Sequence, residues 1–482
     1  MNKRGPLKPK NAVVTLREDD MKKITLITVA LCLAVAMAIP AMATKVNVSG
    51  EYRVRGFYTD NITLDESRSE SQAYYDNRLR VETVFQANDN VSVTTRFDAF
   101  EDEVWGVDAN GATTSAQFET PGAKDTIDFD RVYMTIMTPI GRFQIGRQED
   151  GAWGPAAFDT DNDYYSTDSI QYLGKAGDIL FGAMILKYAE MDSASPWVAD
   201  TVADGDFDAY YIFAGYNKDN IEVGLLCELA RAAEDNVFPV PPPLSSDATV
   251  KDYKIMPYWK LGFGPVNIEG EINYECGDIQ FDSPMPVAAF WSPGSIAFED
   301  DPDIDALVYY IKASADLEMA NVYVGYVSVS GQEEGESDMT MGNLYYGGLG
   351  QGFTPLAILT DDLGGHILNT QGGSIFTATL NGVALHGVDL IYAGADLAVN
   401  DNLSVHLVAG QATANEDWTG DWDDEYGTEV DLGITWNIMD NVTYSATAAY
   451  LSTGDLLAQI GGVAQTNVDD VYGLMHEIKV TF

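Results

Sequence analysis

Residues 474–482 read LMHEIKVTF, and the sequence ends on that phenylalanine. Every second residue from Leu474 to Phe482 is apolar except His476, and the residues between them are Met, Glu, Lys and Thr. This period of two is typical of a β-strand with one apolar and one polar face. A soluble β-sandwich could end this way, and so could a β-barrel whose last strand belongs to the wall. The rest of the sequence favours one of the two.

The first 43 residues have the pattern of an export signal. A short basic segment (MKK) is followed by an apolar run of 16 residues and by the small-residue motif Ala-Met-Ala. Such a run is too short for a membrane helix and is typical of a secretory signal peptide. We interpret the residues before it as the product of a mis-assigned start codon, or alternatively as a cytoplasmic extension. The expected divisions are an extension at 1–20, a signal peptide at 21–43, cleavage between Ala43 and Thr44, and a mature domain at 44–482.

The mature chain is strongly acidic. Residues 1–43 hold seven of the 27 Lys and Arg and three of the 74 Asp and Glu, which leaves 20 against 71 and a net charge of −51. This charge excludes nucleic acid as a partner. Only Cys227 and Cys276 remain after cleavage, which is too few for a disulfide framework. We expect two free thiols, because their expected strands lie two apart in the sheet.

One turn recurs four times along the chain. An Asp-Asn pair followed by an aliphatic residue stands at 89–90, 219–220, 401–402 and 440–441. Asp and Asn tolerate left-handed backbone and bond their own main chain, so these pairs predict tight hairpin turns. Segments of about ten residues flank the turns. The strands we expect are 45–57, 76–87, 91–101, 127–138, 141–148, 168–174, 179–189, 207–217, 221–232, 251–262, 265–275, 304–317, 321–330, 386–399, 403–413, 425–438, 442–452 and 470–482.

Short turns alternate with long polar connections throughout this pattern. A soluble sandwich has no reason to keep its short turns at one end, whereas a transmembrane barrel does. We therefore predict an all-β fold, an antiparallel transmembrane barrel of 18 strands, with short periplasmic turns and long extracellular loops. A count of 16 is the alternative, since 141–148 and 168–174 are short. An open sheet would leave backbone groups unsatisfied in lipid, so the last strand should pair with the first.

Residues 141–148 read GRFQIGRQ. With the signal peptide, the alternation of turns and loops, and the terminal Phe482, this motif resembles the general-diffusion porins of Gram-negative outer membranes. The chain looks most like the homotrimeric porins of sulfate-reducing and related bacteria. The resemblance implies that loop 149–167 folds inward and narrows the pore, that Arg147 faces it from the wall, and that the barrel-assembly machinery reads Phe482. The family's Pro-Glu-Phe-Gly-Gly segment is absent from 149–167, so the position of this loop stays open.

Arginines cluster in the first third of the mature chain. If the apolar parity faces lipid, arginines on these strands face the lumen, and an acidic loop follows them. Fixed positive and negative charge across a water-filled gap would admit small hydrophilic solutes and disfavour apolar ones. Alternatively, the arginines pair with lumenal carboxylates and brace the wall. The predicted basic lining is Arg78, Arg80, Arg96, Arg131 and Arg147, and the predicted acidic constriction is Glu149, Asp150, Asp159, Asp161 and Asp163.

Other chemistry finds little support in the sequence. The run Asp159, Asp161, Asp163 begins like a calcium loop, but Tyr164 stands where an EF-hand needs Gly. It remains a weak calcium candidate, and we expect no resident cofactor. The acidic stretches 299–305 and 421–425 could bind calcium or magnesium that bridges to lipopolysaccharide. The four histidines show no metal-ligand spacing, and no serine lies in a nucleophile-elbow context, so we expect no enzyme.

The sequence thus predicts an outer-membrane porin, a passive diffusion channel for small hydrophilic solutes and ions. The alternative is a surface-structural or adhesive barrel, plugged inside and acting through its long loops, of which 331–385 is the longest. The −51 charge predicts a preference for cations, because acidic groups at the pore mouth raise the local cation concentration.

Overall fold

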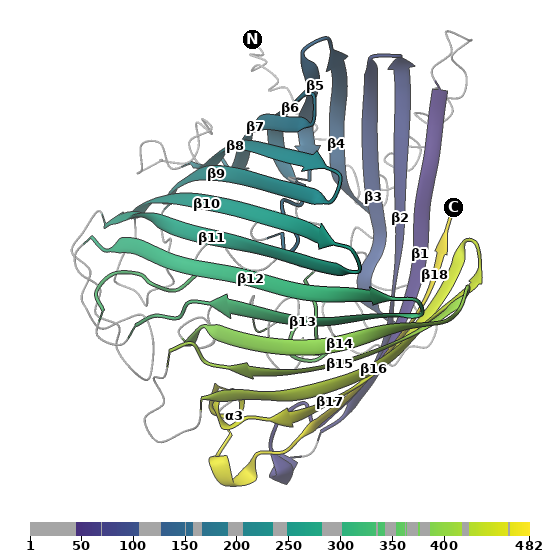
Figure 1. Ribbon diagram of the computed structural model, residues 1–482, viewed down its shortest axis with the longest axis vertical. Coiled ribbons are helices and arrows are strands. Elements are labelled where there is room, and N and C mark those ends of the chain that lie inside the picture. Colours follow the sequence, from purple (N-terminus) through teal and green to yellow (C-terminus); the bar gives the residue numbers. More distant parts are fainter. Residues whose placement is uncertain are drawn as a thin grey trace, which may run out of the picture.

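The computed structural model describes residues 45–68, 70–105, 127–149, 151–157, 166–190, 206–234, 248–281, 301–333, 336–342, 353–361, 363, 375, 386–416, 424–460 and 463–482. Their main feature is one 18-stranded antiparallel sheet (Figure 1). The predicted signal peptide and cleavage site lie outside the described residues. The strands are β1 (Lys45–Asp60), β2 (Gln72–Asn88), β3 (Val91–Val104), β4 (Ile127–Thr138), β5 (Gly141–Gln148), β6 (Thr167–Ala176), β7 (Ile179–Ala189), β8 (Phe207–Lys218), β9 (Ile221–Glu234), β10 (Ala248–Phe263), β11 (Val266–Phe281), β12 (Asp303–Leu317), β13 (Ala320–Val329), β14 (Val388–Asn400), β15 (Leu403–Thr413), β16 (Glu425–Met439), β17 (Val442–Thr453) and β18 (Val471–Thr481).

The sheet closes into a barrel. Each strand pairs with its neighbours in sequence, and β1 pairs with β18 from Glu51–Thr481 to Asp60–Tyr472. Closure satisfies the backbone groups of the first and last strands, which an open edge would expose. The predicted count of 18 is confirmed, and the two short segments in doubt are the wall strands β5 and β6.

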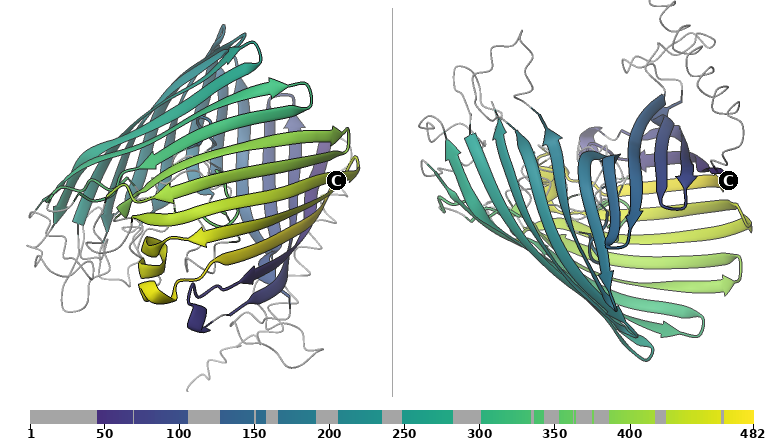
Figure 2. Two further views of the ribbon diagram at one scale, coloured as in Figure 1. Left: turned by 60° about the horizontal axis from the view of Figure 1, so that its bottom comes forward. Right: turned by 90° about the horizontal axis from the view of Figure 1, so that it is seen from above.

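The short turns and two of the described helices lie at opposite rims of the barrel. Figure 1 shows the hairpin turns of β2–β3 and β4–β5 at its top and the turn of β12–β13 at its right, where the C-terminus also lies. The 3-10 helix η1 (Glu66–Arg68) and the helix α3 (Asp455–Ile460) lie at the other rim, as the left view of Figure 2 shows. The Asp-Asn pairs stand at the turns before β3, β9, β15 and β17, as their backbone preferences predict.

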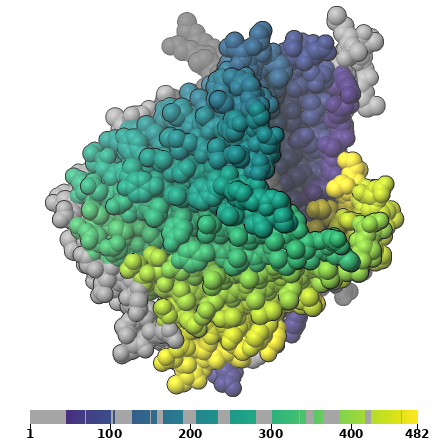
Figure 3. Space-filling model, in the orientation of Figure 1, coloured from purple at the N-terminus to yellow at the C-terminus, as the bar shows by residue number. Residues whose placement is uncertain are grey.

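The two faces of the wall differ in chemistry. Successive side chains point to opposite faces, so Ile212 is 64% exposed on the outside while its neighbour Tyr211 is 2% exposed inside. The outward residues form an apolar surface, and the front wall is continuous from β7 to β17 (Figure 3). An outward apolar face on a closed antiparallel barrel is the arrangement in which β proteins span a membrane. Among the described residues, no helix has the length and apolar character of a membrane span.

Gly56 and Gly50 of β1 lie beside two large side chains across the seam with β18, those of His476 and Phe482. His476, which interrupts the apolar parity of LMHEIKVTF, points outward between the rings of Tyr75 and Tyr444. A side chain at Gly56 would meet its imidazole at 2.4 Å. At the chain end, the N–H of Phe482 donates to the carbonyl of Gly50 at 3.0 Å, and the N–H of Gly50 donates back at 2.9 Å. The last residue is therefore part of the wall, with its ring 59% exposed on the outside.

The two cysteines are free, as predicted. Cys227 lies on β9 and Cys276 on β11, with β10 between them. Both sit on the outward face, since they alternate with the buried residues Leu226 and Glu275.

Candidate functional site in the barrel lumen

Arginines on the inner face of β1–β4 are paired with carboxylates. Arg55 forms a two-point contact with Asp76, with Nε at 3.1 Å and Nη2 at 2.6 Å from the two oxygens. Arg80 contacts both oxygens of Asp98. This pattern favours bracing of the wall, because a paired guanidinium presents little free charge to the lumen. The remaining pairs are Arg78 with Glu51, Arg96 with Asp130, and Arg131 with Glu149.

Four of the five arginines predicted to line the pore therefore lie on the inner face, namely Arg78, Arg80, Arg96 and Arg131. Their side chains are between 6% and 13% exposed. Of the predicted acidic constriction, Glu149 is described and contacts Arg131. The others, Asp150, Asp159, Asp161 and Asp163, lie outside the described residues, and so does the calcium candidate that they include.

The fifth arginine lies on the outer face. Arg147 alternates with Phe143 and Ile145, and its cross-strand neighbours are Val132 and Asp168. Nε and Nη2 of Arg147 donate to Asp168 at 3.1 and 2.9 Å, and the two side chains are 53% and 58% exposed. The prediction that Arg147 lines the pore is wrong, because the side chains of β5 that line the lumen have the other parity.

The segment 151–157, which follows β5, folds into the lumen. The backbone N–H groups of Ala156 and Ala157 donate to one carboxylate oxygen of Glu271 on β11, at 2.8 and 3.1 Å. Gly154 has a φ of +89°, and a Cβ there would lie 2.3 Å from Glu271 Oε2. Glycine at 154 therefore lets the carboxylate approach the backbone. This part of the predicted constriction loop 149–167 is inside the barrel, as the resemblance implied.

Trp153 fixes this segment against the wall at β8 and β10. Its ring packs 5.1 Å from Phe213 on β8 and edge-on, 5.2 Å from Tyr258 on β10. Its indole N–H donates to the carbonyl of Met256 at 3.3 Å. A partly buried aromatic side chain with a bonded N–H holds the segment in one defined position.

A cleft of about 350 Å³ lies between this segment and the wall. One side is polar, with Arg131, Arg142 and Gln144. The other side is apolar, with Trp153 and Phe213. The volume is within the range of small-molecule sites, and the polar side can hydrogen-bond a hydrated solute.

The wall across the barrel from β1 is rich in carboxyl groups. On β9–β11 the ammonium of Lys254 lies 3.7 Å from Glu228 and 3.5 Å from Asp252, and Glu275 is its cross-strand neighbour. In an 18-strand ring β10 stands opposite β1, so an arginine-rich wall faces a carboxyl-rich one. The sequence prediction placed the opposing carboxylates on the loop 149–167 instead, and it did not foresee this wall. Among the described residues, no group of three or more His, Cys, Asp or Glu side chains is arranged to hold a metal ion.

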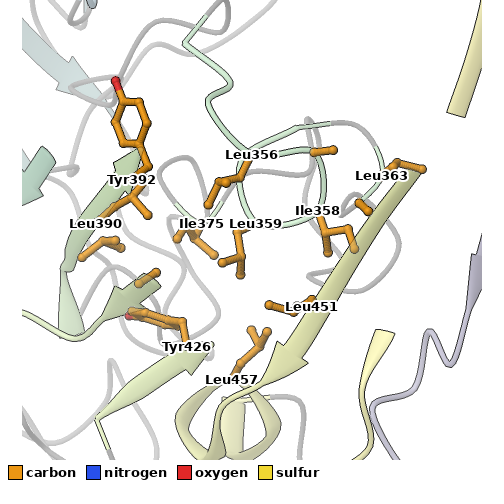
Figure 4. Close-up of a cluster of buried hydrophobic side chains, with 14 of the residues drawn as sticks. Leu356, Ile358, Leu359, Leu363, Ile375, Leu390, Tyr392, Tyr426, Leu451 and Leu457 are labelled. Carbon is orange, nitrogen blue, oxygen red and sulfur yellow. The ribbon is translucent and has the colours of Figure 1, made fainter. Parts of the chain in front are cut away.

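A second segment, at 353–361 with Leu363 and Ile375, also packs inside the barrel. Figure 4 shows its side chains directed at wall residues, among them Leu390 of β14 and Leu451 of β17. Tyr392, Tyr426 and Leu457 complete the surroundings. These contacts bury the apolar patch that the sequence carries at 355–359.

Two carboxylates of β16 hold this second segment. Asp431 Oδ2 accepts the N–H of Ala357 at 3.0 Å, and the two oxygens of Glu429 accept those of Ile358 and Leu359 at 2.6 and 2.8 Å. We call Glu429 and Asp431 the β16 clasp. Sequence reasoning missed the clasp and Glu271. The one feature of the sequence that could have pointed to these three residues is that each is a carboxylate on the inward-facing side of a strand.

Fold and lumen together define a class: an outer-membrane β-barrel that crosses the membrane with 18 strands and has a charged inner face. No protein-family model and no curated protein matches the chain. Among solved structures, OccK8 (OprE) of Pseudomonas aeruginosa gives a TM-score of 0.51 at 11% identity, covering 91% of this chain and 98% of that one. OpdK of Pseudomonas aeruginosa with vanillate gives 0.47 at 10% identity, covering 90% and 98%. An anion-selective porin from Comamonas acidovorans gives 0.40 at 11% identity, covering 91% and 100%. At these identities the likeness concerns the fold.

Proposed function

We propose that the protein is an outer-membrane porin, a water-filled channel for passive diffusion of small hydrophilic solutes and ions. The observation that carries the proposal is the cleft beside 151–157, which lies inside a closed barrel and is bounded on one side by charged and amide groups. A lumen narrowed by an in-folded segment separates solutes by size and polarity without a chemical step. We assign no residue a catalytic role.

The resemblance of the sequence supports finer features of the same proposal. The protein would be a homotrimer of the kind found in sulfate-reducing and related bacteria, inserted by the barrel-assembly machinery through Phe482. Its surroundings would be outer-membrane lipid and lipopolysaccharide, with calcium or magnesium at the acidic rim stretches.

A preference for cations follows from the charge of the chain and of its lumen. Most inward arginines described above are paired with carboxylates, so they oppose cations weakly. The wall of β9–β11 carries three carboxyl groups around Lys254. Acidic groups at the mouth act mainly at low ionic strength, since screening is about 10 Å at 0.1 M salt. The preference should therefore grow as the salt is diluted.

Arg131 and Arg147 give a matched test of this selectivity. Arg131→Ala removes a positive charge beside the cleft and leaves Glu149 without its partner. A unit charge about 10 Å from a passing ion changes its energy by about 0.4 kcal/mol in water, or about twofold in local concentration. The energy of an anion shifts by the same amount in the opposite direction, so we expect the cation-to-anion permeability ratio to rise by about fourfold. Arg147→Ala should leave it unchanged, because Arg147 is on the outer face.

The measurement is the reversal potential across a tenfold salt gradient for the purified protein and both variants. An anion-selective parent channel would refute the charge argument. A larger shift for Arg147→Ala than for Arg131→Ala would contradict the assignment of the two faces.

A plugged surface barrel is the second candidate, and one observation favours it. The segment 353–361, with Leu363 and Ile375, fills part of the lumen against β14–β17. If the outer loops continue this filling across the whole section, the protein would act through its surface as a structural or adhesive barrel. Such a barrel conducts no ions.

A further inference from the structure

The outward apolar surface is not equally tall around the barrel. A lipid-facing belt about 25 Å tall needs about ten residues of a tilted strand. On β10 the outward side chains are apolar from Tyr253 to Phe263, which spans eleven positions. On β5 the outward apolar residues are Phe143 and Ile145 alone, and on β6 they begin at Ile170.

Charged groups end this short belt. Arg147 is six positions above Gly141, where β5 leaves its short turn, and Asp168 is eight positions before Ala176, where β6 enters its own. Six to eight residues rise about 15–20 Å along the membrane normal. The pair therefore lies within the height of the lipid belt. On the next strand Lys187 points outward as well, as the cross-strand neighbour of Asp168.

Exposing this charged face to lipid acyl chains is energetically unfavourable. A lipid-facing arginine near the midplane costs about 2–4 kcal/mol. The contact between Arg147 and Asp168 uses Nε and Nη2, which leaves Nη1 of Arg147 without a bonded partner among the described residues. At this height, a half-exposed guanidinium and carboxylate are more stable in contact with another protein surface than in contact with acyl chains.

We propose that the outward face of β5–β7, marked by Arg147, Asp168 and Lys187, is the contact surface between copies of this chain. The face carries both signs of charge side by side, with Arg147 paired to Asp168 and Lys187 paired to Asp206 and Asp208. A second copy can extend these ion pairs with its own cations and carboxylates. The inference rests on the proposed porin assembly, since it locates the contact that a homo-oligomer needs. It also gives Arg147 a role outside the pore.

Site-specific photo-cross-linking in outer membranes tests this surface without any conductance measurement. Ile170 on β6 and Ile311 on β12 are outward isoleucines of similar exposure, 50% and 45%, on different parts of the wall. With p-benzoyl-phenylalanine at Ile170, we expect a product of twice the chain mass that contains this chain alone. The same group at Ile311 should give no such product. A lipopolysaccharide ladder, a foreign protein, or no product at Ile170 would overturn the proposal.

Charge reversal gives a second readout. Arg147→Glu places two carboxylates together, so we expect the homodimer product at position 170 to fall by about tenfold, about 1.4 kcal/mol in association. Adding Asp168→Arg to that variant should restore it. The monomer should remain a heat-modifiable barrel throughout. An undiminished product in the Arg147→Glu variant would show that the pair lies outside the contact. A channel that conducts but does not cross-link would refute this surface and leave the proposed function standing.

Discussion

Replacing both Glu429 and Asp431 with alanine should raise the single-channel conductance. The double variant leaves the N–H groups of Ala357, Ile358 and Leu359 without their acceptors. A buried donor left unsatisfied costs roughly 1–3 kcal/mol, and three are lost at once. We therefore expect the segment 353–361 to leave its position on the wall and to open the lumen that it fills.

Two further variants show whether the clasp itself is responsible. Glu429→Gln with Asp431→Asn keeps the side-chain volume and one acceptor on each side chain, so its effect should be intermediate. Asp396→Asn changes a carboxyl of β14 that makes no described bond to the segment, and it should leave the conductance unchanged. An unchanged conductance in the double alanine variant, with no new protease cleavage near residue 358, would mean that the clasp does not hold the segment.

Deleting Phe482 should abolish assembly of the barrel while leaving export intact. The deletion removes both backbone hydrogen bonds to Gly50, at 2.9 and 3.0 Å, and the outward ring at the seam. The seam between β18 and β1 closes the sheet, and an unclosed sheet cannot reside in lipid. We expect the heat-modifiable form in the outer membrane to be lost almost completely, with processed chain retained in the periplasm.

Two substitutions separate the ring from the backbone. Phe482→Ala keeps both hydrogen bonds to Gly50 and removes the ring, whereas Phe482→Tyr keeps an aromatic group suited to the membrane interface. If the assembly machinery reads the ring, the alanine variant fails and the tyrosine variant assembles. Normal barrels from the chain lacking Phe482 would contradict the role assigned to the last strand.

The strands of the wall could be predicted because the sequence signals that define them are local. Period-two alternation and Asp-Asn turns place the strands, and even the short segments 141–148 and 168–174 hold their positions as β5 and β6. The strand from 321 alternates poorly, and the structure gives the reason. Val327 and Val329 face inward and are buried in the same apolar cluster as Leu356, so both faces of β13 are apolar.

For Arg147 the family resemblance gave the wrong face of the barrel, whereas the alternation of residues along β5 gives the right one. Phe143, Ile145 and Arg147 share one parity in GRFQIGRQ, so alternation alone places Arg147 with the lipid-facing residues. The family motif suggested a pore-facing role instead. The physical rule is the better guide here, because a strand cannot change the face of one residue without a bulge, and the pairing of β5 with β4 and β6 shows none.

The contacts inside the lumen could not be predicted from the sequence. Glu271 is 115 residues from Ala156, and Glu429 is 71 from Ile358. No local pattern joins a strand carboxylate to the backbone of a distant loop, since any inward Glu or Asp could have met it. Nor could the sequence decide between a lining arginine and a bracing one, because the difference depends on which carboxylate lies opposite.

Single-channel currents recorded from the purified protein in a planar bilayer show whether the lumen conducts. We expect discrete current steps of uniform size, whose amplitude grows with salt concentration. We also expect larger steps when Glu429 and Asp431 are both replaced with alanine. A correctly folded, heat-modifiable barrel that inserts into the bilayer and gives no steps would contradict the porin and establish the plugged barrel in its place.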